Sequence, residues 1–196
     1  MDPSRLPRLT PTELSVDQSA LYEQIAGGER ARGPQAFALV GEDGSLEGPF
    51  NAFLYQTALG TSLESLGAAI RYRTSLTDRE REIAILLTAN HRDSEFERYA
   101  HEAIARNLGM TQDELAALRE LSTQHLHDER EVQVATTVLA LLHNADLTDD
   151  EYQSAVAVLG EVQLVEITTL VGHYSTLAMQ MNVFGVRPPE QVEHIE

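Results

Sequence analysis

The sequence SEFERYAH begins at Ser94 and places Ser94, Glu97 and His101 at intervals of three and four residues. In a helix this spacing brings the three side chains toward one face. Glu97 and His101 then lie at the border between the apolar side, which carries Ile104, and the solvated side. Partial burial at such a border shifts pKa values, as acid–base chemistry requires. The same pattern also fits a capping box, in which Ser94 and Glu97 only start the helix.

A second carboxylate stands one helix earlier. Glu82 heads the apolar run EIAILLTA and shares a helix face with Ile85 and Leu86. A carboxylate on a buried face needs a partner, and His101 could provide it; a Glu and His pair in a small cavity can move protons at carbon. Two simpler interpretations stay open: Glu82 as a first-turn acid favoured by the helix dipole, and His101 as a hydrogen-bonded border histidine without a catalytic role.

Further polar side chains could hold a substrate. Arg71 and Arg73 precede the Glu82 helix, and a guanidinium can hold a carboxylate through two parallel hydrogen bonds. His91 follows that helix, while His173 and Tyr174 interrupt a later apolar one. Surface arginines and a satisfied core pair are the alternative interpretations. The candidate substrate-binding residues are Ser94, His91, Arg71, Arg73, His173 and Tyr174.

Composition excludes several function classes. The 14 basic and 31 acidic residues give a net charge of −17, which would repel phosphate backbones and anionic lipid, so neither nucleic acid nor a membrane is expected as a partner. There is no run of about 18 apolar residues and no apolar segment near the N-terminus, so a cytoplasmic location is expected. The chain has no cysteine, which excludes disulfides, thiolate metal sites and thiol catalysis.

No metal site is predicted either. The sequence HLHDERE, which starts at His125, is more typical of a solvated loop than of a metal site. His101 and Glu102 begin like the HExxH zinc motif, but Ala105 occupies the place of the second histidine.

The remaining pattern predicts an all-α protein. Residues 1–12 are expected to form an irregular arm, residues 13–186 a single helical domain, and residues 187–196 a polar tail. Helix starts are indicated by four Ser/Thr-x-x-Glu pairs, and Gly109 and Gly160 stand where helices should end. The four pairs are Thr77 with Glu80, Ser94 with Glu97, Thr111 with Glu114, and Thr148 with Glu151. The turn-rich segment from about residue 28 to 51 is expected to be an ordered connection, because its apolar residues need cover.

The residues that carry the candidate chemistry also carry a family resemblance. The stretch RYRTSLTDREREIAILLTANHRDSEFERYAHEAIARNLGMTQDELAAL resembles the core of the carboxymuconolactone decarboxylase and alkylhydroperoxidase D superfamily. The similarity extends upstream through GPFNAFLYQTALGTSLESLGAAI and downstream through LVEITTLVGHYSTLAMQMNVF. The hydroperoxidase motif is Glu, eleven residues, Cys, two residues, Cys, three residues, His. Glu82, Ser94, Glu97 and His101 fall on those four positions, so the spacing is kept while both cysteines are replaced.

The resemblance is therefore to the decarboxylase-like branch. That branch has Glu and His at the separation of Glu82 and His101, and often an acid at the position of Glu97. It implies an AhpD-like helical fold, assembly into homo-oligomers such as trimers, and a small carboxylate or lactone substrate. It also implies proton transfer without metal or organic cofactor. A thiol peroxidase is disfavoured, because the required thiols are missing.

The sequence thus predicts a lyase or isomerase. His101 would move the proton, Glu82 would fix its tautomer and raise its basicity, and Glu97 or His91 would serve as the second acid. Because the chain carries a charge of −17, an anionic substrate needs a local cation, for which Arg71 or Arg73 are candidates. The alternative is a non-catalytic member of the same fold that binds a small molecule or serves in assembly.

Overall fold

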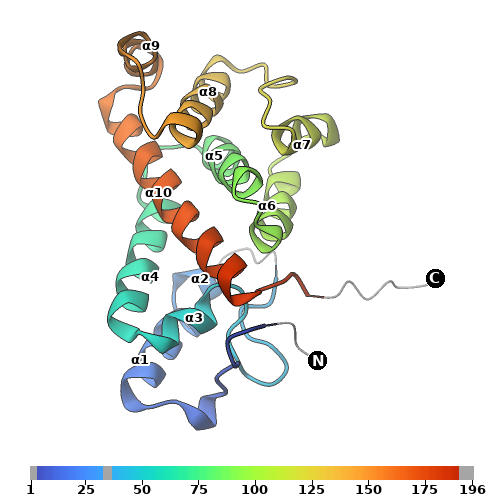
Figure 1. The fold of residues 1–196 in the computed structure, drawn as a ribbon, viewed down its shortest axis with the longest axis vertical. Helices are drawn as coiled ribbons and strands as arrows, with labels where there is room; N and C mark the ends of the chain where they lie inside the picture. Colours follow the sequence, from blue (N-terminus) through green and yellow to red (C-terminus); the bar gives the residue numbers. More distant parts are fainter. Residues whose placement is uncertain (1–3, 33–36, 190–196) are drawn as a thin grey trace, which may run out of the picture.

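The computed structural model describes residues 4–32 and 37–189, which fold into helices joined by short connections (Figure 1). The elements are η1 (Pro11–Glu13), α1 (Val16–Ala26), α2 (Glu29–Arg32), α3 (Phe50–Tyr55), α4 (Thr57–Tyr72), α5 (Asp78–His91), α6 (Glu95–Asn107), α7 (Gln112–Arg119), α8 (Glu129–Asn144), α9 (Asp149–Leu159) and α10 (Glu161–Phe184). No strand is present in this part of the chain, which confirms the all-α prediction.

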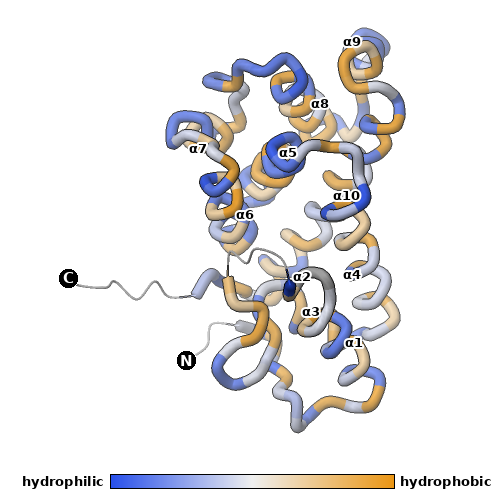
Figure 2. The backbone as a smooth tube through the Cα atoms, turned by 180° about the vertical axis from the view of Figure 1, so that it is seen from behind, coloured by the Kyte–Doolittle hydropathy of each residue, from blue (hydrophilic) through white to orange (hydrophobic). Residues whose placement is uncertain are grey.

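Helix α5 is the centre of the fold. It packs against α6, α8 and α10, and every residue from Glu82 to Ala89 is buried. Figure 2 shows why: the first turn of α5 is hydrophilic and the rest is mostly hydrophobic. Helix α10 runs across the molecule beside α4 (Figure 1), so that α4, α5 and α10 surround a common interior. An element covered on several sides can place a side chain with little freedom to move.

Three of the four predicted capping boxes are confirmed. Thr77 starts α5, Thr111 starts α7 and Thr148 starts α9, each with its hydroxyl accepting from the backbone N–H of the glutamate three residues later. The fourth is wrong. Ser94 does start α6 as its N-cap residue, but its side chain makes no capping hydrogen bond, and the Glu97 carboxylate contacts His101 instead of the N-cap backbone.

Two glycines follow the ends of helices, as predicted, and a third glycine lies inside a helix without interrupting it. Gly109 and Gly160 have φ values of 84° and 82°, a left-handed conformation that favours glycine. Gly172, by contrast, lies inside α10, which continues unbroken for 24 residues. The polar residues His173 and Tyr174 therefore lie on a continuous helix.

The N-terminal arm is irregular but firmly attached. The Asn51 side chain accepts from the Leu9 backbone N–H and donates to the Pro7 carbonyl, at 3.0 Å in both cases. Arg8 forms an ion pair with Glu47. These contacts hold the arm against the segment that precedes α3. Residues 1–3 of the predicted arm and residues 190–196 of the predicted tail lie outside the described residues.

The described part of the segment before α4 is an ordered connection, as predicted. It also contains a helix, α3, that the turn-rich sequence did not predict. Leu39 and Leu46 are buried beside an isolated bridge between Val40 and Leu46, and Phe50–Tyr55 forms α3. We call residues 37–53 the roof segment, because it covers the cavity described below; residues 33–36 are not among those the structure describes.

In the described part of the chain, no single helix combines the length and apolarity needed to cross a bilayer. Helices α9 and α10 pass that test only together, as a pair bent by 113°.

Candidate active site

His101 lies between two carboxylates. Its Nδ1 is 2.6 Å from Glu82 Oε2, and its Nε2 is 3.1 Å from Glu97 Oε2. All three side chains are buried: the exposed fractions are 6% for His101, 1% for Glu82 and 4% for Glu97. Both ring nitrogens are therefore occupied by acceptors, and the ring has one orientation that satisfies both.

The short connection between α5 and α6 fixes this arrangement. The Ser94 backbone N–H donates to the Ala89 carbonyl at 2.9 Å, and Asp93 in the turn has a φ of 50°. The turn places α6 against α5, so that His101 meets Glu82 from the neighbouring helix. Glu97 stands one helical turn before His101 on α6 itself, which is the spacing at which helix side chains meet.

The two carboxylates keep the imidazole charged. Burial alone would lower the pKa of His101, but the charges and hydrogen bonds of Glu82 and Glu97 outweigh burial and raise it to about 9. His101 is therefore an imidazolium at neutral pH.

A small cavity opens beside the trio. Its volume is about 60 Å³, enough for several water molecules. It is lined by Phe37, Leu39, Pro49, Phe50, Phe53, Leu63, Glu64, Arg71, Phe96, Glu97, Ala100, His101, Ile104, His173, Tyr174 and Leu177. The walls are mostly apolar and aromatic, with a few polar groups that converge on one space, as in sites for small molecules.

Several predicted site residues meet at this cavity. Arg71, His173 and Tyr174 line it together with Glu97 and His101. The Tyr174 ring stands edge-to-face to both the His101 and the His173 rings, with centroids 5.4 Å apart in each pair. Glu82 lies behind His101 and does not line the cavity, as a residue that orients the imidazole would.

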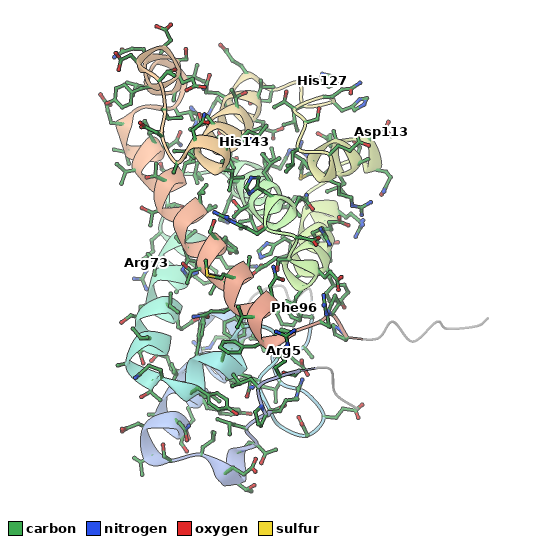
Figure 3. All side chains as sticks on the ribbon, in the orientation of Figure 1. Arg5, Arg73, Phe96, Asp113, His127 and His143 are labelled. Atoms are coloured by element: carbon green, nitrogen blue, oxygen red, sulfur yellow. The ribbon has the colours of Figure 1, made fainter. Side chains whose placement is uncertain are left out.

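Three other candidates lie elsewhere. Arg73 is exposed at the end of α4, and Figure 3 places it at the edge of the molecule, away from Phe96. The His91 ring packs against the His143 ring at 5.4 Å, and its pKa is lowered by burial, Arg92 and His143. Ser94 is fully buried, and its hydroxyl has no hydrogen-bond partner among the described residues.

Sequence reasoning missed the roof segment and Glu64. Phe37, Phe50 and Phe53 line the cavity, and the Phe37 ring stands edge-to-face to Phe96 of α6. Gly48 comes so close to Phe96 that an added Cβ would be 2.6 Å from its ring. Glu64, on α4, is a buried carboxylate that lines the same cavity. The available signal was a cluster of aromatic residues inside a turn-rich segment, which a surface loop would not contain.

In the part of the chain that the structure describes, no group of three or more His, Asp and Glu side chains is arranged to hold a metal ion.

Solved structures of known proteins share this architecture, although no protein-family model and no curated protein matches the sequence. An uncharacterized peroxidase-related protein with an alkylhydroperoxidase AhpD core, from Ralstonia eutropha JMP134, superposes with a TM-score of 0.75 at 13% identity. The match covers 97% of this chain and 94% of that one. The chain has the AhpD-like fold.

Two further matches show how varied the proteins with this fold are. A putative antioxidant defence protein AhpD from Agrobacterium tumefaciens matches with a TM-score of 0.64 at 16% identity, over 73% of this chain and 99% of that one. The debrominase Bmp8, as a cysteine-to-alanine variant in complex with 2,3,4-tribromopyrrole, matches with a TM-score of 0.70 at 10% identity, over 97% and 92% of the two chains. The AhpD-like fold predicted from the sequence is thus confirmed, whereas fold alone does not determine the reaction.

Proposed function

We propose that this protein is a cofactor-free lyase or isomerase that moves a proton at a carbon atom of a small carboxylated or lactone-type metabolite. One observation carries the proposal: an imidazolium bonded to two buried carboxylates forms part of the wall of a small cavity that Arg71 also lines. A buried histidine with a raised pKa at the wall of a mostly apolar cavity is typical of acid–base catalysts.

The geometry divides the roles differently from the sequence-based hypothesis. Because both nitrogens of His101 are bonded to carboxylates, its ring has no free acceptor for a substrate proton. Glu97 lines the cavity, and among the described residues its carboxylate has no hydrogen-bond partner besides His101. We therefore assign Glu97 as the group that exchanges the proton with the substrate. His101 is the proton reservoir behind it, and Glu82 the positioning residue.

Two reactions fit this arrangement. In an isomerisation, Glu97 removes a proton from the carbon next to a carbonyl and returns it to a second carbon. In a decarboxylation, the carbon–carbon bond to the carboxylate breaks and CO2 leaves with no electrons from that bond. The resulting enolate takes a proton from His101 through Glu97, and His101 regains a proton from water.

The lining supports a substrate with one anionic end and an apolar ring. Arg71 supplies a cation for a carboxylate or an enolate oxygen, and the phenylalanine rings supply an apolar surface. The volume of about 60 Å³ favours a molecule of few heavy atoms. The AhpD-like protein Bmp8 was solved with tribromopyrrole, also a small ring.

The test is an exchange experiment in D2O. A panel of carboxylated lactones, β-keto acids and unsaturated carboxylates is incubated with the protein and followed by NMR for deuterium at carbon, with CO2 release measured in parallel. We expect exchange or decarboxylation of at least one compound, lost in His101→Gln. Tight binding of panel members with neither exchange nor CO2 release would favour the non-catalytic binding module.

Two neighbouring arginines offer a matched control. Arg71 lines the cavity, whereas Arg73 lies two residues later and is exposed. We expect Arg71→Ala to raise KM for a carboxylated substrate by about 10- to 100-fold, as the loss of a charge-assisted contact implies. Arg73→Ala should leave KM unchanged. Equal effects of the two changes would remove Arg71 from substrate binding.

A further inference from the structure

Helix α10 has an outer face that nothing in the described chain covers. Val162, Val165, Met179 and Val183 on this helix are exposed at 68%, 64%, 61% and 52%. The outer stripe of α10, as we call it, consists of Val162, Val165, Thr169, Gly172, Thr176, Met179 and Val183, all exposed and spaced alternately by three and four residues. This is the spacing at which one helix meets another along a seam.

The stripe is more apolar than its sequence suggests. The Thr169 hydroxyl donates to the Val165 carbonyl at 2.8 Å, and the Thr176 hydroxyl donates to the Gly172 carbonyl at 3.0 Å. Both hydroxyls are thus satisfied by the helix itself, and the threonines can offer methyl groups to a partner. The stripe contains no charged residue, although 23% of the chain is charged.

Gly172 has no explanation within the chain. It lies in the exposed interior of a helix, where glycine is destabilising relative to alanine. A Cβ built at this position would meet nothing within 4 Å, so no contact of its own chain requires a glycine. A missing side chain at the centre of an apolar stripe allows the backbone of a second helix to approach closely.

We infer that the outer stripe of α10 is a two-fold contact between two copies of this chain, in which the two α10 helices cross antiparallel near Gly172. Gly172 is the twelfth of the 24 residues of α10, so it is close to the midpoint of the helix. Val165 and Met179 stand seven residues to either side of it. A two-fold axis near Gly172 therefore brings Val165 of one copy opposite Met179 of the other.

Charge favours a second copy as the occupant. Two chains of charge −17 repel each other, so they can associate most readily through a surface that bears no charge. A basic partner protein would be expected to use acidic residues at the contact, and the stripe offers none.

The size of the contact indicates a contribution from α4. With 24 residues, α10 is about 36 Å long, and a contact strip about 10 Å wide offers roughly 360 Å² per copy. A stable interface buries about 800 Å² per partner. Helix α4 packs beside α10 (Figure 1) and carries Leu59 and Leu66, which are exposed at 64% and 37%. We assign these two leucines to the edge of the same contact.

A charge placed on the stripe tests the surface. We expect light scattering to show an assembly for the wild type, and Val165→Glu to weaken the association by about 100-fold, because it buries an unpaired charge. Val16→Glu is the matched control, since Val16 is 87% exposed on α1, outside the stripe, and should leave the mass unchanged. Circular dichroism checks that both variants fold. A monomeric wild type, or an assembly that Val165→Glu leaves intact, would overturn the inference.

The absence of cysteine makes a cross-linking test unambiguous. In one helix, positions 165 and 179 are about 21 Å apart, so a disulfide between them must join two chains. We expect Val165→Cys/Met179→Cys to form a covalent dimer on mild oxidation, while Val165→Cys alone does not. This result does not depend on the behaviour of the glutamate variant. Cross-linking by Val165→Cys alone would indicate parallel helices, and no cross-link in the double variant would exclude the antiparallel contact.

Discussion

The N-termini of α5 and α6 have the same sequence pattern and use it for different purposes. At α5, the Thr77 hydroxyl accepts from the Glu80 N–H and the Glu80 carboxylate accepts from the Thr77 N–H at 2.8 Å. At α6, the Ser94 side chain caps nothing, and the Glu97 carboxylate bonds to His101. Glu80 completes the capping box of α5, whereas Glu97 does not cap α6 and lines the cavity beside His101. The contrast shows that a local motif makes a capping role possible, and that the contacts of the side chain with distant residues determine whether it has that role.

Exchanging each glutamate for its amide gives the largest expected difference. Glu97→Gln should lower kcat/KM of the proposed reaction by about 1000-fold, because an amide cannot accept the proton. Glu80→Gln should have the opposite effect: it weakens the buried contacts to Thr77 and Arg130 and lowers stability, while turnover is kept. Steady-state kinetics and urea unfolding of both variants measure the two effects. Full activity in Glu97→Gln would show that Glu97 does not exchange a proton with the substrate.

Titration of His101 gives the next largest effect. Its pKa in the folded protein, about 9, is above the ordinary value of 6.5, so the folded state binds the proton more tightly than the unfolded state. The stabilisation is complete below pH 6.5 and is lost as the pH rises through about 9, with a total of up to about 3 kcal/mol. We expect the free energy of unfolding to fall over this range in the wild type and to fall less in His101→Gln. Equal slopes would show that the imidazolium adds nothing to stability.

A thiol at position 97 would report on the charge of the His101 imidazolium. In Glu97→Cys, the imidazolium of His101 and the start of α6 should lower the thiol pKa by about two units from its usual value near 8.5. The absorbance of the thiolate as a function of pH measures this shift, and the absence of other cysteines leaves a single signal. Asp150→Cys, in the exposed first turn of α9, is the control: it has a helix start but no histidine held beside it, so its thiol pKa should be lowered less. A thiol pKa at position 97 that is no lower than the one at position 150 would mean that His101 does not act on position 97.

Removing the two N-cap hydroxyls gives the smallest effects. Thr77→Ala removes a capping hydrogen bond and should lower the free energy of unfolding by about 1 kcal/mol. Ser94→Ala removes a buried hydroxyl that has no hydrogen-bond partner among the described residues, so stability should be unchanged or slightly higher. Chemical denaturation of the two variants measures both values. A loss of stability in Ser94→Ala as large as that in Thr77→Ala would show that the Ser94 hydroxyl is bonded after all.

The parts of the molecule that could be predicted from the sequence are those determined by near neighbours in the chain. The starts of α5, α7 and α9 follow from pairs three residues apart, and Glu97 and His101 follow from one helical turn. The pairing of Glu82 with His101 was predicted as well, because both lie on buried faces of consecutive helices and the family resemblance keeps their spacing.

The rest depends on contacts between distant residues. No period in the sequence shows that Phe50 and Phe53 cover the His101 cavity, because the position of α3 depends on its packing against α1 and α4 and on the hydrogen bonds of Asn51 to the N-terminal arm. Arg71 and Arg73 are equivalent in the sequence, and only the end of α4 determines which of them lines the cavity. The two arginines are two residues apart, about 200° around a helix, so their side chains point to different sides.

The attachment of the N-terminal arm also has a consequence for biosynthesis. The Arg5 backbone N–H donates to the Phe184 carbonyl at 2.7 Å, and the Ser4 hydroxyl reaches the same carbonyl across 180 residues of sequence. On the ribosome the arm emerges before the helices described above, but its partner at the end of α10 is synthesised after all of them. The arm cannot take its final position co-translationally, so the native fold is completed only when Phe184 has left the ribosomal exit tunnel.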